Sequence, residues 1–135
     1  MECLVFALLL VLSAIEPAST QQDIAGAASV IDGDTIEIHG QRIRLFGIDA
    51  PEGGQLCVRP NSERWRCGQQ LGFALSDRIR RATVRCQARD RDRFAVCFKE
   101  TEDLNRWMVA NGWAATYRRY SVDYVADEDA ARRNH

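Results

Sequence analysis

The sequence has few histidines and no apolar run long enough to span a membrane as a helix. It contains two histidines, His39 and His135, and no Cys-x-x-Cys pair, which disfavours a zinc site. Its longest apolar run, residues 4–15, is shorter than the roughly 20 residues of a membrane-spanning helix. Lysine occurs once, at Lys99. All other basic residues are arginines, which bind phosphate or carboxylate in two places, although genomic base composition explains most of them equally well.

Residues 1–20 are typical of a secretory signal peptide. The apolar run is followed by small residues, with cleavage expected at residues 18–20 or 25–27. The segment starts with Glu2 rather than with a basic residue, so an uncleaved membrane anchor stays the alternative. We expect one domain over residues 21–135, secreted or periplasmic, with no stable membrane association after cleavage.

The charge balance gives no general attraction to nucleic acid. The chain has 18 basic and 19 acidic residues, and removal of residues 1–20 leaves 18 and 17, a net charge of +1. The 135 residues, 46% apolar and 27% charged, are typical of a single globular domain. Nothing in the sequence requires more than a monomer.

Four cysteines remain once Cys3 leaves with the signal segment. They are Cys57, Cys67, Cys86 and Cys97. Four cysteines permit three pairings, and an exported domain keeps disulfides. We expect the local pairs Cys57 with Cys67 and Cys86 with Cys97, the second because it would link two neighbouring strands. In the loop-closure account each such bond contributes about 3 kcal/mol.

Apolar periodicity predicts strands in the first half of the domain. Strands are expected at residues 29–31, 35–38 and 42–48, and the turns between them at 32–34 and 39–40. The third strand is apolar on both faces, so we expect it to be central.

Helices and one further hairpin are predicted in the second half. The expected elements are a helix over 63–80, strands over 83–87 and 94–98 joined by a charged tip, and helices over 103–111 and 121–133. Asn61 or Ser62 is the expected cap of the first helix and Ser121 that of the last. In the last helix the spacing of Glu128 to Arg132 and of Asp129 to Arg133 suits an exposed face. The order of strands and helices is that of the oligonucleotide/oligosaccharide-binding (OB) barrel. The predicted fold is therefore α+β, a five-stranded OB-fold barrel with about three helices.

Three acids are expected to meet at one rim of this barrel. Asp34 follows a turn, Asp49 ends the paired strand, and Pro51 bends the chain so that Glu52 can return toward them. Converging carboxylates repel one another unless a cation lies between them, and calcium accepts irregular oxygen coordination. For Asp32 the Asp-Gly turn is a sufficient explanation, and the same explanation is the alternative for the other acids.

Three segments together resemble the staphylococcal nuclease (thermonuclease-like) family. They are VIDGDTIEI at 30–38, RIRLFGIDAPE at 42–52 and DLNRWMVANGWA at 103–114. The cysteine spacing and residues 65–68 are similar to the secreted, disulfide-containing bacterial branch. The resemblance implies an OB barrel that hydrolyses phosphodiester bonds in DNA and RNA with calcium and without strong sequence specificity.

The resemblance also implies roles for individual residues. Asp34 and Asp49 would bind calcium together with the backbone carbonyl of Ala50. Glu52 would orient or deprotonate the attacking water, and Arg44 would hold the phosphate. These roles are physically coherent, because a cation and a guanidinium neutralise the charge that develops on phosphorus.

The substrate-binding side of the resemblance is less complete. Tyr117 and Tyr120 resemble the tyrosines that line the family's nucleotide pocket. The family's second arginine lies in an Asp-Arg-Tyr-Gly-Arg segment, which here lacks its Tyr-Gly-Arg. Arg93 or Arg91 is the candidate substitute.

Two alternatives remain open on sequence alone. The shortened hairpin favours a weakened or inactive module of the same barrel that binds nucleic acid or metal. The acid cluster would be a coincidence of turns if the protein were a small disulfide-stabilised exported domain with an unrelated partner.

Overall fold

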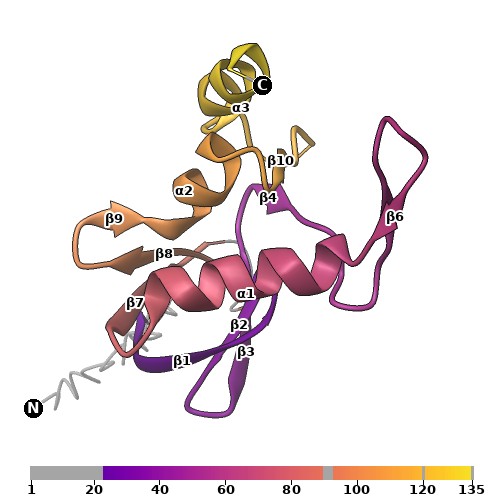
Figure 1. Cartoon of the computed structure of the whole chain (residues 1–135). Coiled ribbons are helices and arrows are strands. Elements are labelled where there is room, and N and C mark those ends of the chain that lie inside the picture. The colour runs from indigo at the N-terminus through magenta and orange to yellow at the C-terminus, as the bar shows by residue number, and fades with distance from the viewer. Residues whose placement is uncertain (1–22, 90–92, 120, 135) are drawn as a thin grey trace, which may run out of the picture.

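A computed structural model describes residues 23–89, 93–119 and 121–134 (Figure 1). The predicted signal segment, Arg91 and Tyr120 lie outside the described residues. The strands are β1 (Ile24–Asp32), β2 (Thr35–Ile38), β3 (Gln41–Leu45), β4 (Ile48–Asp49), β5 (Cys57–Val58), β6 (Arg64–Trp65), β7 (Thr83–Ala88), β8 (Phe94–Lys99), β9 (Glu102–Asp103) and β10 (Ala115–Thr116). The helices are α1 (Cys67–Ile79), α2 (Leu104–Ala110) and α3 (Val125–Arg133). None of the helices in this part of the chain has both the length and the apolar character needed to cross a membrane.

Five of these strands form a closed barrel. The sheet runs β3-β2-β1-β7-β8-β9, and β3 also pairs with β8 in parallel, with Arg44 opposite Phe94. The buried side chain of Asn105 reinforces this closure: its amide donates to the carbonyls of Phe46 at 2.9 Å and Ala95 at 3.1 Å. The closed barrel with three helices confirms the predicted α+β OB fold.

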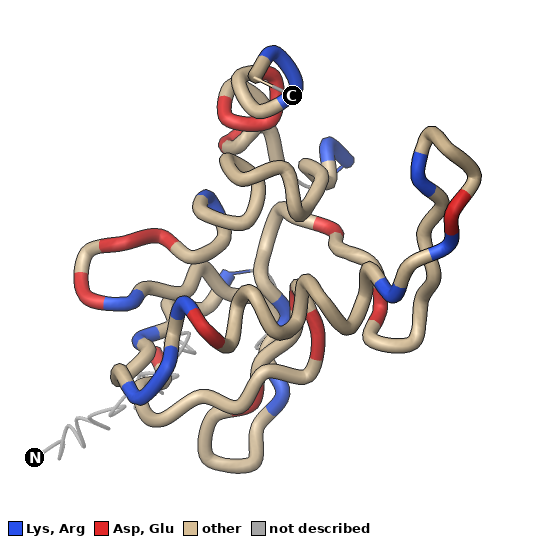
Figure 2. Tube along the Cα trace, viewed as in Figure 1, with Lys and Arg blue, Asp and Glu red and all other residues tan. Residues whose placement is uncertain are grey.

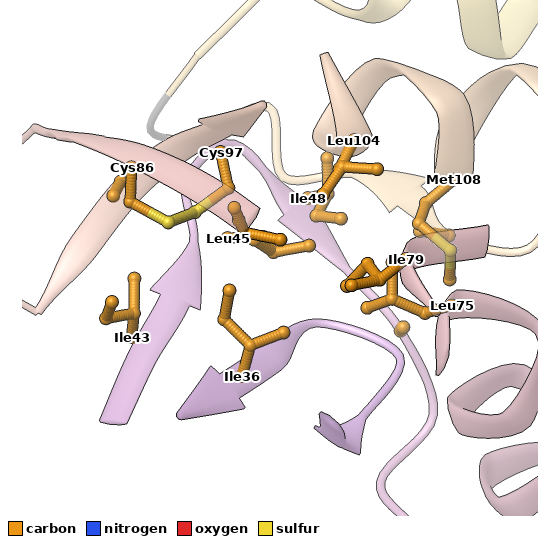
Figure 3. Packing of buried hydrophobic residues seen from close by; sticks show 14 of the residues in the cluster. Ile36, Ile43, Leu45, Ile48, Leu75, Ile79, Cys86, Cys97, Leu104 and Met108 are labelled. Carbon is orange, nitrogen blue, oxygen red and sulfur yellow. A yellow bond between two sulfur atoms is a disulfide. The ribbon is translucent and has the colours of Figure 1, made fainter. Parts of the chain in front are cut away.

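The core fills the barrel and the space beneath α1 and α2 (Figure 3). Ile36 and Ile38 of β2 and Ile43 and Leu45 of β3 are almost fully buried, as their alternation predicts. Each such side chain contributes about 1.5–3 kcal/mol when it is removed from water. The pairing of these two strands fixes the rim from which the site residues emerge.

Both predicted disulfides are present. Cys57 bonds to Cys67, and Cys86 bonds to Cys97. Cys86 lies directly opposite Cys97 in the β7–β8 pair, so the second bond links neighbouring strands as expected. The first bond ties the short β5–β6 hairpin to the start of α1.

The boundaries of two predicted strands were wrong. Strand β1 begins at Ile24, because Ile24 to Ala27 pair with β7. Cleavage at residues 25–27 would remove residues that pair with β7. The predicted strand 42–48 is two strands, because Gly47 has a φ of +79° and bends the chain there.

Two helix starts were also wrong. α1 begins at Cys67 rather than at residue 63, because residues 57–65 pair as the β5–β6 hairpin. The Asn61 side chain accepts the Glu63 N–H within this hairpin and caps no helix. α3 begins at Val125, four residues after Ser121. The Ser121 hydroxyl accepts the N–H of Asp123 and therefore does not cap the helix.

Candidate active site

Asp34 lies buried in the turn immediately before β2. One of its carboxylate oxygens accepts the N–H of Ala50 at 3.0 Å, and the other accepts the hydroxyl of Thr35 at 3.0 Å. The Asp32 side chain accepts the Asp34 N–H at 3.1 Å, which is the turn role predicted for Asp32. These bonds hold Asp34 at the rim with 7% of its side chain exposed.

The charge of Asp34 is unfavourable in this position. Burial raises the pKa of its carboxyl above the ordinary value, and the nearby Asp32 carboxyl raises the pKa further. The Ala50 N–H and the Thr35 hydroxyl favour the charged form and act in the opposite direction. A cation beside Asp34 would therefore relieve an electrostatic cost.

Arg44 joins the two predicted metal-binding carboxylates. One guanidinium nitrogen lies 3.2 Å from an oxygen of Asp49 and 3.6 Å from an oxygen of Asp34. The β2–β3 pairing brings Arg44 beside Asp34, since Thr35 lies opposite Arg44 and Leu45 donates its N–H to the Asp34 carbonyl at 2.8 Å. Arg44 and Asp49 are about half exposed, so the pair faces solvent while Asp34 forms the floor.

Glu52 does not join Asp34 and Asp49 in the expected group of three. Within the described residues, no three His, Cys, Asp or Glu side chains come together in a way that could hold a metal. After Pro51 the backbone turns against α1, where a Cβ on Gly68 would lie 1.6 Å from the Glu52 carbonyl oxygen. Gly68 therefore permits this close packing, and the backbone of Glu52 forms hydrogen bonds with Gln55.

A small cleft borders Arg44. It has a volume of about 120 Å³, and its walls include Arg44, Phe46, Phe94 and Tyr117. Tyr117 is fixed there by its N–H, which donates to the Gly47 carbonyl at 2.8 Å. The structure thus places Tyr117 and Arg44 in the walls of one cleft. Tyr120 cannot be compared, because it is outside the described residues.

The backbone of Arg93 also reaches this site. Its carbonyl accepts the N–H of Arg44 at 2.7 Å at the start of β8. The candidate second arginine is thereby anchored next to the first. Arg91, the other candidate, is outside the described residues.

Glu128 is a site-supporting residue that the sequence did not reveal. Its carboxylate accepts the N–H of Thr116 at 2.5 Å and a guanidinium N–H of Arg118 at 3.0 Å, and it lies 3.5 Å from Arg132. Burial opposes the charge of Glu128, yet these partners lower the pKa of its carboxyl below the ordinary value. Glu128 was expected on an exposed face because of its spacing to Arg132. That expectation was wrong, because the side chain is 7% exposed and turned toward β10.

Asp34 and Asp49 are oxygen donors of the kind that a hard divalent cation prefers, but among the described residues they form a pair and not a group of three. The oxygens of Asp34 and Asp49 contact the same nitrogen of Arg44, so they are close neighbours. Calcium takes six to eight oxygen ligands. Two carboxylates, with or without the Ala50 carbonyl, leave several positions for water and phosphate.

Comparison with known proteins adds two relatives, while no family model matches the chain. The first, "Succinoglycan biosynthesis protein ExoI" of Rhizobium meliloti, is 40% identical over 101 residues, which are 70% of this chain and 53% of that protein. The second, an "Uncharacterized endonuclease" of Haemophilus influenzae, is 29% identical over 131 residues, which are 90% of this chain and 68% of that protein. The chain thus spans about half of the first relative's length. It is a homologue of two curated proteins, one of which is named an endonuclease.

Proposed function

We propose that this protein is an exported, calcium-dependent nuclease that hydrolyses phosphodiester bonds in DNA and RNA without strong sequence specificity. The observation that carries the proposal is the position of Arg44. Its guanidinium lies between Asp34 and Asp49 and opens onto the cleft that contains Tyr117. The similarity to a protein named an endonuclease and the resemblance to the staphylococcal nuclease family support the same reaction.

Each residue has a role that suits its surroundings. Asp34 and Asp49 would hold the cation, and when bound it would polarise a phosphate oxygen and lower the pKa of water. Arg44 would bind the scissile phosphate and stabilise the charge that develops on it. Its present contacts with the two aspartates would be exchanged for the cation and the phosphate.

Three further residues complete the proposal. Glu52 is exposed and stands apart from the Asp34–Asp49 pair here, so its role of orienting or deprotonating the attacking water rests on the family resemblance alone. Arg93 would extend from its anchored backbone to add a second positive charge. Tyr117 would contact the nucleoside next to the scissile phosphate.

Export is proposed from the disulfides. Two such bonds in a small domain are typical of secreted or periplasmic proteins, because reducing compartments keep thiols reduced. A monomer without membrane attachment is sufficient for the proposed reaction.

The direct test is cleavage by the purified, oxidised protein. We expect degradation of plasmid and denatured DNA at millimolar calcium, and no degradation with a calcium chelator. Intact DNA under the first condition would remove the enzyme and favour the alternative, a binding module weakened by its shortened hairpin. Inserting Tyr-Gly-Arg into that hairpin separates the two: a large gain in cleavage would show that the natural chain is catalytically weakened.

A further inference from the structure

A second and larger hollow adjoins the proposed active site. Its volume is about 640 Å³, and it lies between the β5–β6 hairpin, the segment after α2, and α3. Ile48 lines the small cleft, and the next residue of β4, Asp49, lines this groove. Figure 1 shows the hairpin that contains β6 projecting from the barrel beside β4 and β10. The two hollows therefore lie along the same strand, β4, which carries a proposed metal ligand.

Two indole rings form part of the groove wall. Trp65 comes from the hairpin and Trp113 from the segment after α2, and both are half-buried. Trp113 is held by an edge-to-face contact with Trp107, with ring centroids 4.9 Å apart. Indole faces bind unpaired bases by stacking, and they do so without strong preference among bases. Bases inside a duplex are already stacked on one another and cannot reach such a wall.

The charged residues that line the groove are Asp49, Glu128 and Arg132, and further arginines lie on the neighbouring hairpin. The hairpin and the residue that follows it carry Arg59, Arg64 and Arg66 against a single acid, Glu63, and Figure 2 shows basic positions along this projection. The Arg59 guanidinium lies over the Trp65 ring, 4.8 Å from its centroid. On the opposite side, Arg132 of α3 lines the groove, lies 3.5 Å from Glu128 and is 71% exposed. Arginines beside aromatic rings match a strand whose phosphates and bases alternate.

We propose that this groove binds the single-stranded segment that continues from the scissile phosphate on the side away from the Tyr117 cleft. Bases contact Trp65 and Trp113, and Arg59 and Arg132 contact phosphates. The proposal rests on the nuclease function proposed above and names its substrate as single-stranded or locally opened nucleic acid. It also gives the β5–β6 hairpin a function, which is to form one wall of the substrate path.

The kinetic test compares substrates of different length. The reference substrate is a thymidine dinucleotide with one cleavable phosphodiester. The longer substrates carry six additional thymidines on either the 5′ or the 3′ side of that linkage, and all their other linkages are phosphorothioates. For the extension that enters the groove we expect a rise in kcat/KM over the dinucleotide. Trp65→Ala should lower kcat/KM on the extended substrate by about tenfold, which is the effect expected for the loss of one base stack. Trp65→Phe should retain most of it, because a phenyl ring still stacks.

Phe73→Ala is the matched control. Phe73 is an aromatic residue of α1 that is 55% exposed and does not line the groove. This variant should keep the full dependence on length. Equal losses for Trp65→Ala on short and long substrates, or an active enzyme with no length dependence, would overturn the groove while leaving the nuclease in place.

A binding measurement separates failure of the groove from failure of catalysis. Calcium-free wild-type protein is irradiated with an oligothymidylate that carries 5-iodouracil, and the cross-linked residue is identified by mass spectrometry. We expect cross-links at Trp65 or Trp113, even in a protein that cleaves nothing. Cross-links confined to residues outside the groove contradict the proposal. The absence of any cross-link, combined with binding of an apolar peptide in the groove, also contradicts it.

Discussion

The carboxylate of Glu128 in α3 accepts the backbone N–H of Thr116 in β10 at 2.5 Å. β10 pairs with β4, with Thr116 opposite Ile48 and Ala115 opposite Asp49. The last helix is therefore connected, through one side chain and one short strand pair, to a proposed metal ligand. Stability and activity should both depend on Glu128.

Replacement of Glu128 by alanine should lower the free energy of unfolding by about 1–3 kcal/mol, because it leaves the buried Thr116 N–H without its acceptor. Chemical denaturation measures this loss. Asp129→Asn is the control: Asp129 is the next residue, also approaches Arg118 at 3.7 Å, and is 48% exposed. A control variant as unstable as Glu128→Ala would mean that the general charge of α3 matters and the Thr116 contact does not.

The contribution of Glu128 should depend on pH in a defined direction. Its pKa is lowered in the folded protein, so the stabilisation is fully present above the unfolded value of 4.5 and is lost as pH falls through the folded pKa. The difference in unfolding free energy between wild type and Glu128→Gln should therefore shrink below pH 4.5. Denaturation curves measured from neutral to acidic pH test this, and a difference that grows on acidification contradicts the assignment.

Thr116 offers a stabilising substitution. Within the described residues its buried hydroxyl oxygen has no hydrogen-bond partner. Thr116→Val keeps the shape of the side chain and the backbone N–H that Glu128 accepts, and it removes a desolvated polar group. We expect a gain of about 1 kcal/mol in unfolding free energy. Thr35→Val is a useful contrast, because the Thr35 hydroxyl donates to Asp34, and this variant should not gain stability.

Loss of the Asp34 charge should separate stability from calcium binding. Because the folded pKa of Asp34 is raised, its charged form costs stability as pH rises from the ordinary value of 3.8 through the folded pKa. Asp34→Asn should therefore melt no lower than wild type in calcium-free buffer at neutral pH. Calcium should raise the melting temperature of wild type and leave that of Asp34→Asn unchanged. Asp77→Asn, an exposed change on α1, is the control and should respond to calcium as wild type does.

The two disulfides should differ in their contribution although they close rings of similar size. Separations of 10 and 11 residues give each bond about 3 kcal/mol in the loop-closure account. Cys86 and Cys97 are fully buried in the barrel, so replacing both with alanine also leaves a cavity. We expect this double variant to be the less stable in urea. The Cys57→Ala/Cys67→Ala variant should lose less stability and be cut more readily by protease in the hairpin.

The alternation of apolar residues predicted the strands, and the order of the strands and helices, together with the family resemblance, predicted the barrel. Ile36, Ile38, Ile43 and Leu45 lie on the faces that their spacing indicates, and the cysteine spacing predicted both bonds. The start of α1 could not be predicted in this way. It depends on pairing between β5 and β6 and on the contact of Gly68 with Glu52, which local propensity does not encode.

Only part of the candidate site was predictable. The Asp-Gly turn and the end of the predicted strand indicated Asp34 and Asp49, and the family resemblance implied Arg44, which the β2–β3 pairing places opposite Thr35. Glu128 was assigned to solvent because the helical spacing to Arg132 describes one element alone. The Glu128 side chain is buried because α3 packs on β10, where the carboxylate accepts the N–H of Thr116, twelve residues earlier. Helical spacing within one element cannot predict such a tertiary contact.

The central claim is that Arg44 and the two aspartates form a calcium-dependent phosphodiester site, and the rate of DNA cleavage by Arg44 variants tests it most directly. Arg42 is the matched control, because it is exposed on the same strand and lies 3.8 Å from Glu37, away from the two aspartates. At saturating calcium, Arg44→Ala should lose about 10²–10³ in kcat/KM on denatured DNA. Arg44→Lys should recover little, since lysine lacks the two-point contact, and Arg42→Ala should match wild type. Cleavage by Arg44→Ala within about twofold of the wild-type rate would contradict the account.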